Sequence, residues 1–392
     1  MNHQNKSKYL ICFFLLALVF SCTKEKIANE QIEKFVKFFG SSYTGEGMQI
    51  SQLEDGSYIL AGHTSSNDSL KNDFYLAKAD VYGNETWSKR IGRNADEKLY
   101  SMQILADGGY ILAGTTNITI NSISYTNVLL VRTNANGDTL WTRTIGGAQN
   151  ITGNCIQVKN DGSFLIAGNI LSAADNNDAS FITTDSQGLN EKIRIKKADG
   201  NQTVKYIIEK EDNFLLIGSN AGALDVKGTS DIYLLSATPL IISSPKTFGG
   251  NGADFGKAIK QLLDGSFIGI ATYTSPKDSG NNFGLFKFTT QGDSIRILWF
   301  RDYGTLLNDD VSAVAITKSG IAMTGTTTNS DGSTDILFIR TDFEGNEQLK
   351  RSIGGLGNQR AFGLCKTADD GVVIAGNNEN GGNSVLMLIK LK

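Results

Sequence analysis

An all-β fold made of seven repeats of one four-stranded unit is predicted by three features of the sequence. A motif of the type Asp-Gly-Ser-Tyr-Ile-Leu-Ala-Gly recurs every 50 to 54 residues. Glycine is abundant (43 residues) and proline is scarce (3), which favours many tight turns between short strands. The two ends of the chain carry complementary parts of one unit. Because units of about 40–50 residues that stack radially form β-propellers, the sequence predicts a seven-bladed β-propeller.

Unit two shows the strands that are expected in each repeat. Four antiparallel strands, named A to D, are predicted at residues 100–106 (YSMQILA), 110–116 (YILAGTT), 128–133 (VLLVRT) and 139–145 (TLWTRTI). Asp107-Gly108-Gly109 and Asn136-Gly137-Asp138 are hairpin signals, since glycine accepts the positive φ that such turns require. Strands B and C are almost continuously apolar, as expected where both faces of a sheet are buried. Such a sheet is stable only between two neighbours, which a closed ring provides.

The ends of the chain predict how the ring closes. Unit seven has strands A to C, the last at 385–390, but the chain ends before a strand D. Residues 34–40 (KFVKFFG) precede unit one and match the D strands that contain Trp87 and Trp141. This N-terminal segment is therefore expected to supply strand D of the last blade, which also removes an exposed sheet edge.

The first 31 residues are expected to be a targeting and anchoring segment. Lys6 and Lys8 precede an apolar run at 10–20, whose eleven residues are too few to span a bilayer, where about 20 are needed. The run ends in Val19-Phe20-Ser21-Cys22, which resembles the lipobox of bacterial lipoproteins, although Phe20 departs from the usual small or aliphatic choice. The resemblance implies a signal peptide at 1–21, lipidation of Cys22, a tether at 22–31 and a propeller at 32–392. The implied location is the outer membrane, with the periplasmic and cell-surface sides both left open.

Charge, cysteine and histidine content restrict the function. The net charge is −3, and it becomes −5 when Lys6 and Lys8 are removed with the signal peptide. Nucleic-acid binding, which needs a clustered basic surface, is therefore not expected. Cys155 and Cys365 fall in units three and seven, on roughly opposite sides of the ring, so no disulfide is expected. The processed chain keeps one histidine, His63, which leaves no histidine triad or multi-histidine metal site.

The repeat signature also carries a resemblance. The pattern D-G-[GS]-[YF]-[IL]-[LI]-A-G, with Asn-Gly before Trp-x-[KR]-x-x-Gly, resembles the propeller repeats of secreted Bacteroidota proteins. It is also similar to quinoprotein-dehydrogenase-like propellers, and the resemblance implies that Trp87, Trp141 and Trp299 pack between blades. The resemblance implies the fold and leaves the activity open, because propellers host many unrelated functions.

The connections between strands B and C differ most from one unit to the next. They are expected on the same face as the crossovers from strand D to the next strand A. Loops on a rigid scaffold commonly carry function, so this face is the candidate recognition surface. Its candidate binding residues are Asp96, Tyr125, Asp254, Tyr273, Asp309 and Asp331. No cofactor is expected, with calcium at Asp331 as the alternative, since its loop has calcium-like spacing but lacks the terminal glutamate.

One position just before strand C is Asp or Asn in every unit. We expect these residues to form local structural hydrogen bonds rather than a ring of cation ligands. They are Asp73, Asn127, Asp178, Asp231, Asn282, Asp335 and Asn383.

These features favour a non-catalytic binding or scaffolding protein: a lipid-anchored monomer of the bacterial envelope that recognises a protein or a glycan. The alternative is a propeller enzyme, either quinone-dependent or acting on polysaccharide through two acids about 5–9.5 Å apart. The quinone version lacks the adjacent cysteine pair of many such dehydrogenases. The acids available to the second version are Asp96, Asp254, Asp309 and Asp310, if their crossovers converge.

Overall fold

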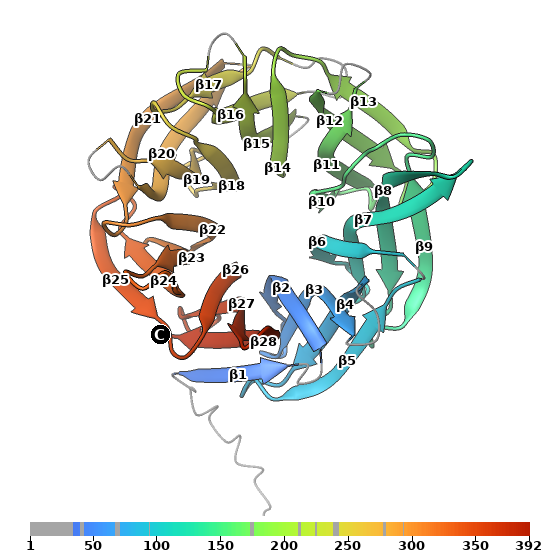
Figure 1. The fold of residues 1–392 in the computed structure, drawn as a ribbon, viewed down its shortest axis with the longest axis horizontal. Helices are drawn as coiled ribbons and strands as arrows, with labels where there is room; N and C mark the ends of the chain where they lie inside the picture. The colour runs from blue at the N-terminus through green and yellow to red at the C-terminus, as the bar shows by residue number, and fades with distance from the viewer. Residues whose placement is uncertain are drawn as a thin grey trace, which may run out of the picture. The chain divides into compact units, whose positions relative to one another are not determined.

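The computed structural model confirms the predicted seven-bladed β-propeller (Figure 1). It describes residues 34–39, 43–66, 71–93, 95–172, 176–210, 213–223, 226–237, 243–276, 280–292 and 294–392. The expected signal peptide, Cys22 and the tether lie outside these residues. The described part forms seven four-stranded antiparallel sheets and contains no helix long and apolar enough to cross a membrane.

The strands follow one another radially, and strand A of each blade lies nearest the centre of the ring (Figure 1). Blade 1 consists of β2 (Tyr43–Gln52), β3 (Tyr58–Ser66), β4 (Asn72–Ala79) and β5 (Glu85–Ile91). Blade 2 consists of β6 (Glu97–Ile104), β7 (Tyr110–Ile120), β8 (Ile123–Thr133) and β9 (Thr139–Ile145). Blade 3 consists of β10 (Cys155–Val158), β11 (Phe164–Leu171), β12 (Asn177–Thr184) and β13 (Lys192–Lys196). Blade 4 consists of β14 (Asn201–Lys210), β15 (Asn213–Ala221), β16 (Asp231–Ala237) and β17 (Lys246–Phe248).

The last three blades repeat this order. Blade 5 consists of β18 (Phe255–Gln261), β19 (Phe267–Thr274), β20 (Asn281–Gln291) and β21 (Ser294–Tyr303). Blade 6 consists of β22 (Asp309–Ile316), β23 (Ile321–Thr328), β24 (Thr334–Thr341) and β25 (Glu347–Ile353). Blade 7 consists of β26 (Asn358–Lys366), β27 (Val372–Asn380), β28 (Asn383–Leu391) and, from the start of the chain, β1 (Phe35–Phe39).

The ring closes as the sequence predicts. Strand β1 pairs antiparallel with β28 at the outer rim, with Phe35 opposite Lys390 and Phe39 opposite Leu386 (Figure 1). Phe39 is buried in the cluster between blades 7 and 1. The start and the end of the described chain are therefore joined in one sheet.

The core consists of layers between blades. Seven hydrophobic clusters are found among the described residues, and each contains buried side chains from two adjacent blades. Strands B and C supply most of them: β7 is buried from Tyr110 to Thr116, and β16 along its whole length. The double-sided burial explains why these strands lack the alternation of a half-exposed sheet.

Two local predictions differ from the structure. Residues 117–127 form a long hairpin rather than a loop: β7 runs to Ile120, β8 begins at Ile123, and Asn121 and Ser122 turn the chain with φ of 50° and 65°. Asn383 is not the blade-7 equivalent of Asp73, because the register of β1 with β28 places Val385 at that position. Gly381 and Gly382 lead into β28 with positive φ, so Asn383 is a turn residue.

Candidate functional site

The molecule has two functionally distinct faces. The crossover face carries the D–A crossovers and B–C connections, such as 92–96 and 117–127. The hairpin face carries the A–B and C–D turns, such as 159–163 and 185–190. This division follows from four antiparallel strands per blade, and hydrogen bonds between crossovers and B–C connections bear it out.

On the crossover face, Asp254 and Asp309 are structural residues. Each is fully buried at the start of strand A and accepts the backbone N–H four residues earlier, from Gly250 and Thr305 respectively. Asp254 also accepts the N–H of Thr274 at 2.7 Å. Burial raises the pKa of both carboxyl groups, against the opposing effect of these donors. The carboxylates hold the crossovers in place through these hydrogen bonds.

Asp96 has a similar role. Its Oδ1 accepts the backbone N–H of Asn72 at 3.0 Å and the side-chain amide of the same residue at 2.8 Å. Burial acts to raise its pKa, but the bonds from Asn72 hold the pKa below its usual value. The equivalent bond to a B–C backbone N–H is made in other blades by Asn150, Asn201, Asn308 and Asn358.

The remaining predicted residues lie on different blades. Tyr125 is half-buried on the extended hairpin of blade 2. Tyr273 packs its ring against Phe300, with centroids 4.7 Å apart. Asp331 lies in an exposed turn and accepts the N–H and hydroxyl of Ser333, which lower its pKa. The structure brings Asp254 close to Tyr273 through Thr274 but does not gather the set into one site.

The environments of His63, Cys155 and Cys365 are also those of structural residues. His63 is buried in β3 with Nε2 3.6 Å from Oε2 of Glu46, and burial lowers the pKa of its imidazole. Cys155 and Cys365 are free thiols, which confirms that they do not bridge. Among the described residues, no cluster of three or more His, Cys, Asp or Glu is placed to hold a metal ion.

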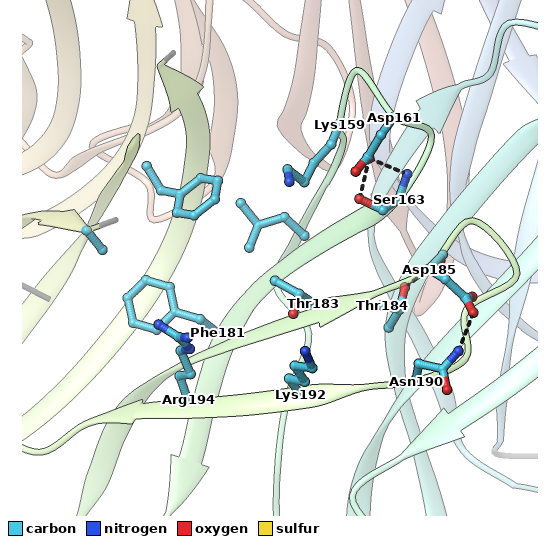
Figure 2. Close-up of a pocket in the computed structure, with 13 residues that line it drawn as sticks. Lys159, Asp161, Ser163, Phe181, Thr183, Thr184, Asp185, Asn190, Lys192 and Arg194 are labelled. Carbon is cyan, nitrogen blue, oxygen red and sulfur yellow. Dashed lines mark hydrogen bonds between the residues drawn. The ribbon is translucent and has the colours of Figure 1, made fainter. Parts of the chain in front are cut away.

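A cavity of about 460 Å³ lies on the hairpin face between blades 3 and 4 (Figure 2). Sequence reasoning missed it. Its floor is apolar, formed by Leu165, Phe181, Phe214 and Ala237. Its polar walls come from the A–B turn, the C–D turn and β13 of blade 3, and include Lys159, Asp161, Asp185, Lys192 and Arg194. A volume of this size lies in the range of small-molecule sites, about 300–1,000 Å³.

The cavity lies where four other junctions between blades hold an aromatic ring, from Trp87, Trp141, Trp299 or Phe35. Trp87, Trp141 and Trp299 in strand D each contact a glycine in the C–D turn of the next blade, at Gly137, Gly188 and Gly345. A side-chain Cβ at Gly188, whose φ is +68°, would lie 2.9 Å from Trp141. Phe35 of β1 contacts Gly83 in the same way. The expected packing of the tryptophans between blades is thus confirmed.

In blade 3, a lysine occupies this aromatic position. Trp141 lies opposite Arg132, one residue before the end of β8, and Lys192 lies opposite Thr183, one residue before the end of β12. A missing indole leaves a gap, because this side chain buries about 150–250 Å² where it packs. The sequence contains a sign of this gap, because Lys192 departs from the Trp-x-[KR] pattern. The effect of that departure on packing depends on the neighbouring blade.

The anionic and cationic side chains of the cavity differ in their hydrogen-bond partners. Asp161 accepts the N–H and hydroxyl of Ser163, and Asp185 accepts the N–H of Leu189 and the amide of Asn190 (Figure 2). These hydrogen bonds lower the pKa of both carboxyl groups, which stay ionised at neutral pH. Within the described chain, the side chains at 159, 192 and 194 form no hydrogen bond and no ion pair with a carboxylate. The cations are thus the groups with free hydrogen-bonding capacity.

Comparisons with known proteins identify the fold only. No family model and no curated protein matches the sequence. A protein of unknown function from Dyadobacter fermentans is similar in structure, with TM-score 0.52, 9% identity and coverage of 92% of this chain and 99% of that one. An ulvan lyase of polysaccharide lyase family PL25 has TM-score 0.55, 10% identity and coverage of 89% and 94%. A Trypanosoma rangeli sialidase has TM-score 0.50 and 8% identity over 89% of this chain, which spans about half (55%) of the sialidase chain.

Proposed function

We propose that the chain is a non-catalytic binding or scaffolding propeller of the bacterial envelope, anchored through a lipid on Cys22. It recognises a protein or glycan through the crossover face. The observation that carries the proposal is the state of the acids on this face. Asp96, Asp254 and Asp309 each accept at least one backbone N–H, and Asp310 is paired with Lys257 at 2.8 Å. A glycan-cleaving mechanism would need two carboxyl groups facing the substrate.

The hairpin at 117–127 supports recognition of a protein. In its register Ile118 lies opposite Tyr125 and Ile120 opposite Ile123, so these four side chains share one face because residues alternate along a strand. Ile123 is 56% exposed. Figure 1 shows β7 and β8 projecting past the outer rim of the ring. An exposed apolar face on a projecting hairpin is a typical contact element of an interface.

The experiment is chemical crosslinking on intact cells followed by purification of the tagged protein. Wild type is compared with a double variant, Ile120→Ser and Ile123→Ser, and with a matched control on the polar face of the hairpin, Thr119→Ala and Ser124→Ala. The proposal expects one crosslinked species that the apolar-face variant loses and the control keeps. Equal capture by all three proteins contradicts the role of the hairpin. Cleavage of polysaccharide by the purified protein contradicts the non-catalytic function.

Anchoring is tested separately. Replacing Cys22 by alanine removes the thiol that would carry the lipid, so the protein is expected to move from the membrane fraction to the soluble fraction. Protease treatment of intact cells then distinguishes the cell-surface from the periplasmic side. An unchanged membrane fraction for the variant contradicts anchoring through Cys22.

A further inference from the structure

We propose that the cavity between blades 3 and 4 binds a small organic anion, a carboxylate or sulfonate-like group attached to an apolar body. This site lies on the hairpin face and does not rest on the function proposed for the crossover face. At this junction Lys192 occupies the position that holds an aromatic ring on blades 1, 2, 5 and 7.

The geometry of β13 directs two cations into the junction. Successive side chains alternate in a strand, so Lys192 and Arg194 project to one side and Ile193 to the other. Ile193 packs against the cluster between blades 2 and 3, which places Lys192 and Arg194 on the blade-4 side. Figure 2 shows these two residues on one side of Phe181 and Thr183, with Lys159 coming from the A–B turn on the other.

Arg194 differs from its equivalents on blades 2 and 5. Arg143 stands over the ring of Trp141 at 5.0 Å, and Arg301 over Trp299 at 5.7 Å, each two residues after its tryptophan. Arg194 keeps the same place after Lys192, which offers no ring. Its guanidinium is therefore available, and arginine recognises carboxylates and related anions through paired N–H donors.

The apolar floor of the cavity favours an anion that carries an apolar body. Leu165, Phe181 and Phe214 are buried in the cluster between blades 3 and 4 and line the cavity. A hydrated inorganic ion would leave this surface uncovered, whereas an aromatic or alicyclic anion would cover it and place its charge on the cationic wall. The two carboxylates at 161 and 185 are held in their turns by N–H and O–H donors and stay ionised. The lining thus sets three cations, Lys159, Lys192 and Arg194, against two anions and keeps one excess positive charge.

The test uses 2-naphthalenesulfonate and its uncharged analogue 2-naphthalenesulfonamide, titrated by calorimetry into residues 22–392 carrying Cys22→Ser. Wild type is expected to bind the sulfonate at one site and the sulfonamide about tenfold or more weakly, since the uncharged analogue cannot form an ionic hydrogen bond with the cations. Lys192→Trp, which restores the residue of blades 1, 2 and 5, is expected to abolish binding. The double variant Lys192→Gln and Arg194→Gln is expected to lose the preference for the sulfonate.

A matched control is Arg301→Gln, which removes the equivalent arginine on blade 5 and is expected to bind the sulfonate as wild type does. Thermal unfolding verifies that every variant is folded. The proposal is overturned if wild type does not bind the sulfonate, if folded Lys192→Trp binds it as tightly, or if the double variant keeps the preference. Loss of the envelope partner in the crosslinking experiment has no bearing on these outcomes.

Discussion

The junction between blades 2 and 3 and the junction between blades 3 and 4 share one architecture, but the strand-D side chain at the aromatic position differs. In the first, Trp141 packs on Gly188 and Arg143 stands over the indole ring. In the second, Lys192 replaces the tryptophan, and a cavity of about 460 Å³ is present. The comparison teaches that the outer layer of a junction can be changed into a pocket while the inner layers remain buried.

The inner layers explain why the change is tolerated. At the second junction Cys155, Leu165, Val204 and Leu216 are each at most 2% exposed. These side chains come from strands A and B, near the ring centre, and they pack without help from strand D. Hydrophobic burial there maintains the contact between the blades.

The largest effect is expected where a junction loses a whole strand. Deletion of residues 32–40 removes β1, exposes β28 as an edge and uncovers the cluster between blades 7 and 1. The protein is expected to aggregate or to be cut rapidly by protease, as measured by limited proteolysis and light scattering. An unchanged melting temperature would refute this closure.

The next largest effect is expected for Trp141→Ala. This change opens a gap at the junction of blades 2 and 3, where the indole ring packs on Gly188. Unfolding in urea should show a loss of about 3 kcal/mol. Lys192→Ala is the control at the equivalent position, with an expected change within about 0.5 kcal/mol because the lysine is exposed. Equal losses for the two variants would show that the junctions do not differ.

The reverse substitution should have a smaller, stabilising effect. Lys192→Trp fills the cavity with the residue that other blades use, and cavity filling commonly contributes about 0.5–2 kcal/mol. Unfolding in urea is expected to shift to higher concentration with an unchanged slope. A decrease in stability would indicate that the blade-4 side of the cavity cannot accept an indole ring.

The smallest effect distinguishes the two arginines. Arg143→Gln removes a cation over an aromatic ring, so a loss of about 0.5–1 kcal/mol is expected. Arg194→Gln removes no such contact and should leave the free energy of unfolding within about 0.5 kcal/mol of wild type. The two unfolding curves are measured side by side at one salt concentration. A larger loss for Arg194→Gln would mean that this residue already has a stabilising partner.

Sequence reasoning succeeded where the interaction is local or repeated. The hairpin signals at 107–109 and 136–138 and the apolar runs at 110–116 and 128–133 predicted their turns and strands. The sequence does not reveal the surroundings of Asp254 and Asp309, two predicted binding residues that are buried and bonded to backbone N–H groups. An acid in a crossover has the same appearance in the sequence whether it faces solvent or the chain.

By itself, the sequence determined the repeat, the blade count and the closure by residues 34–40. The reason is that each unit carries its own apolar strand pattern and its own turn residues. Only the tertiary structure decided that a cavity lies beside Lys192, because the space around a side chain depends on what the neighbouring blade presents. Phe214 and Ala237 of blade 4, far from Lys192 in the chain, complete that site. Contacts between units are not encoded in the pattern of either unit alone.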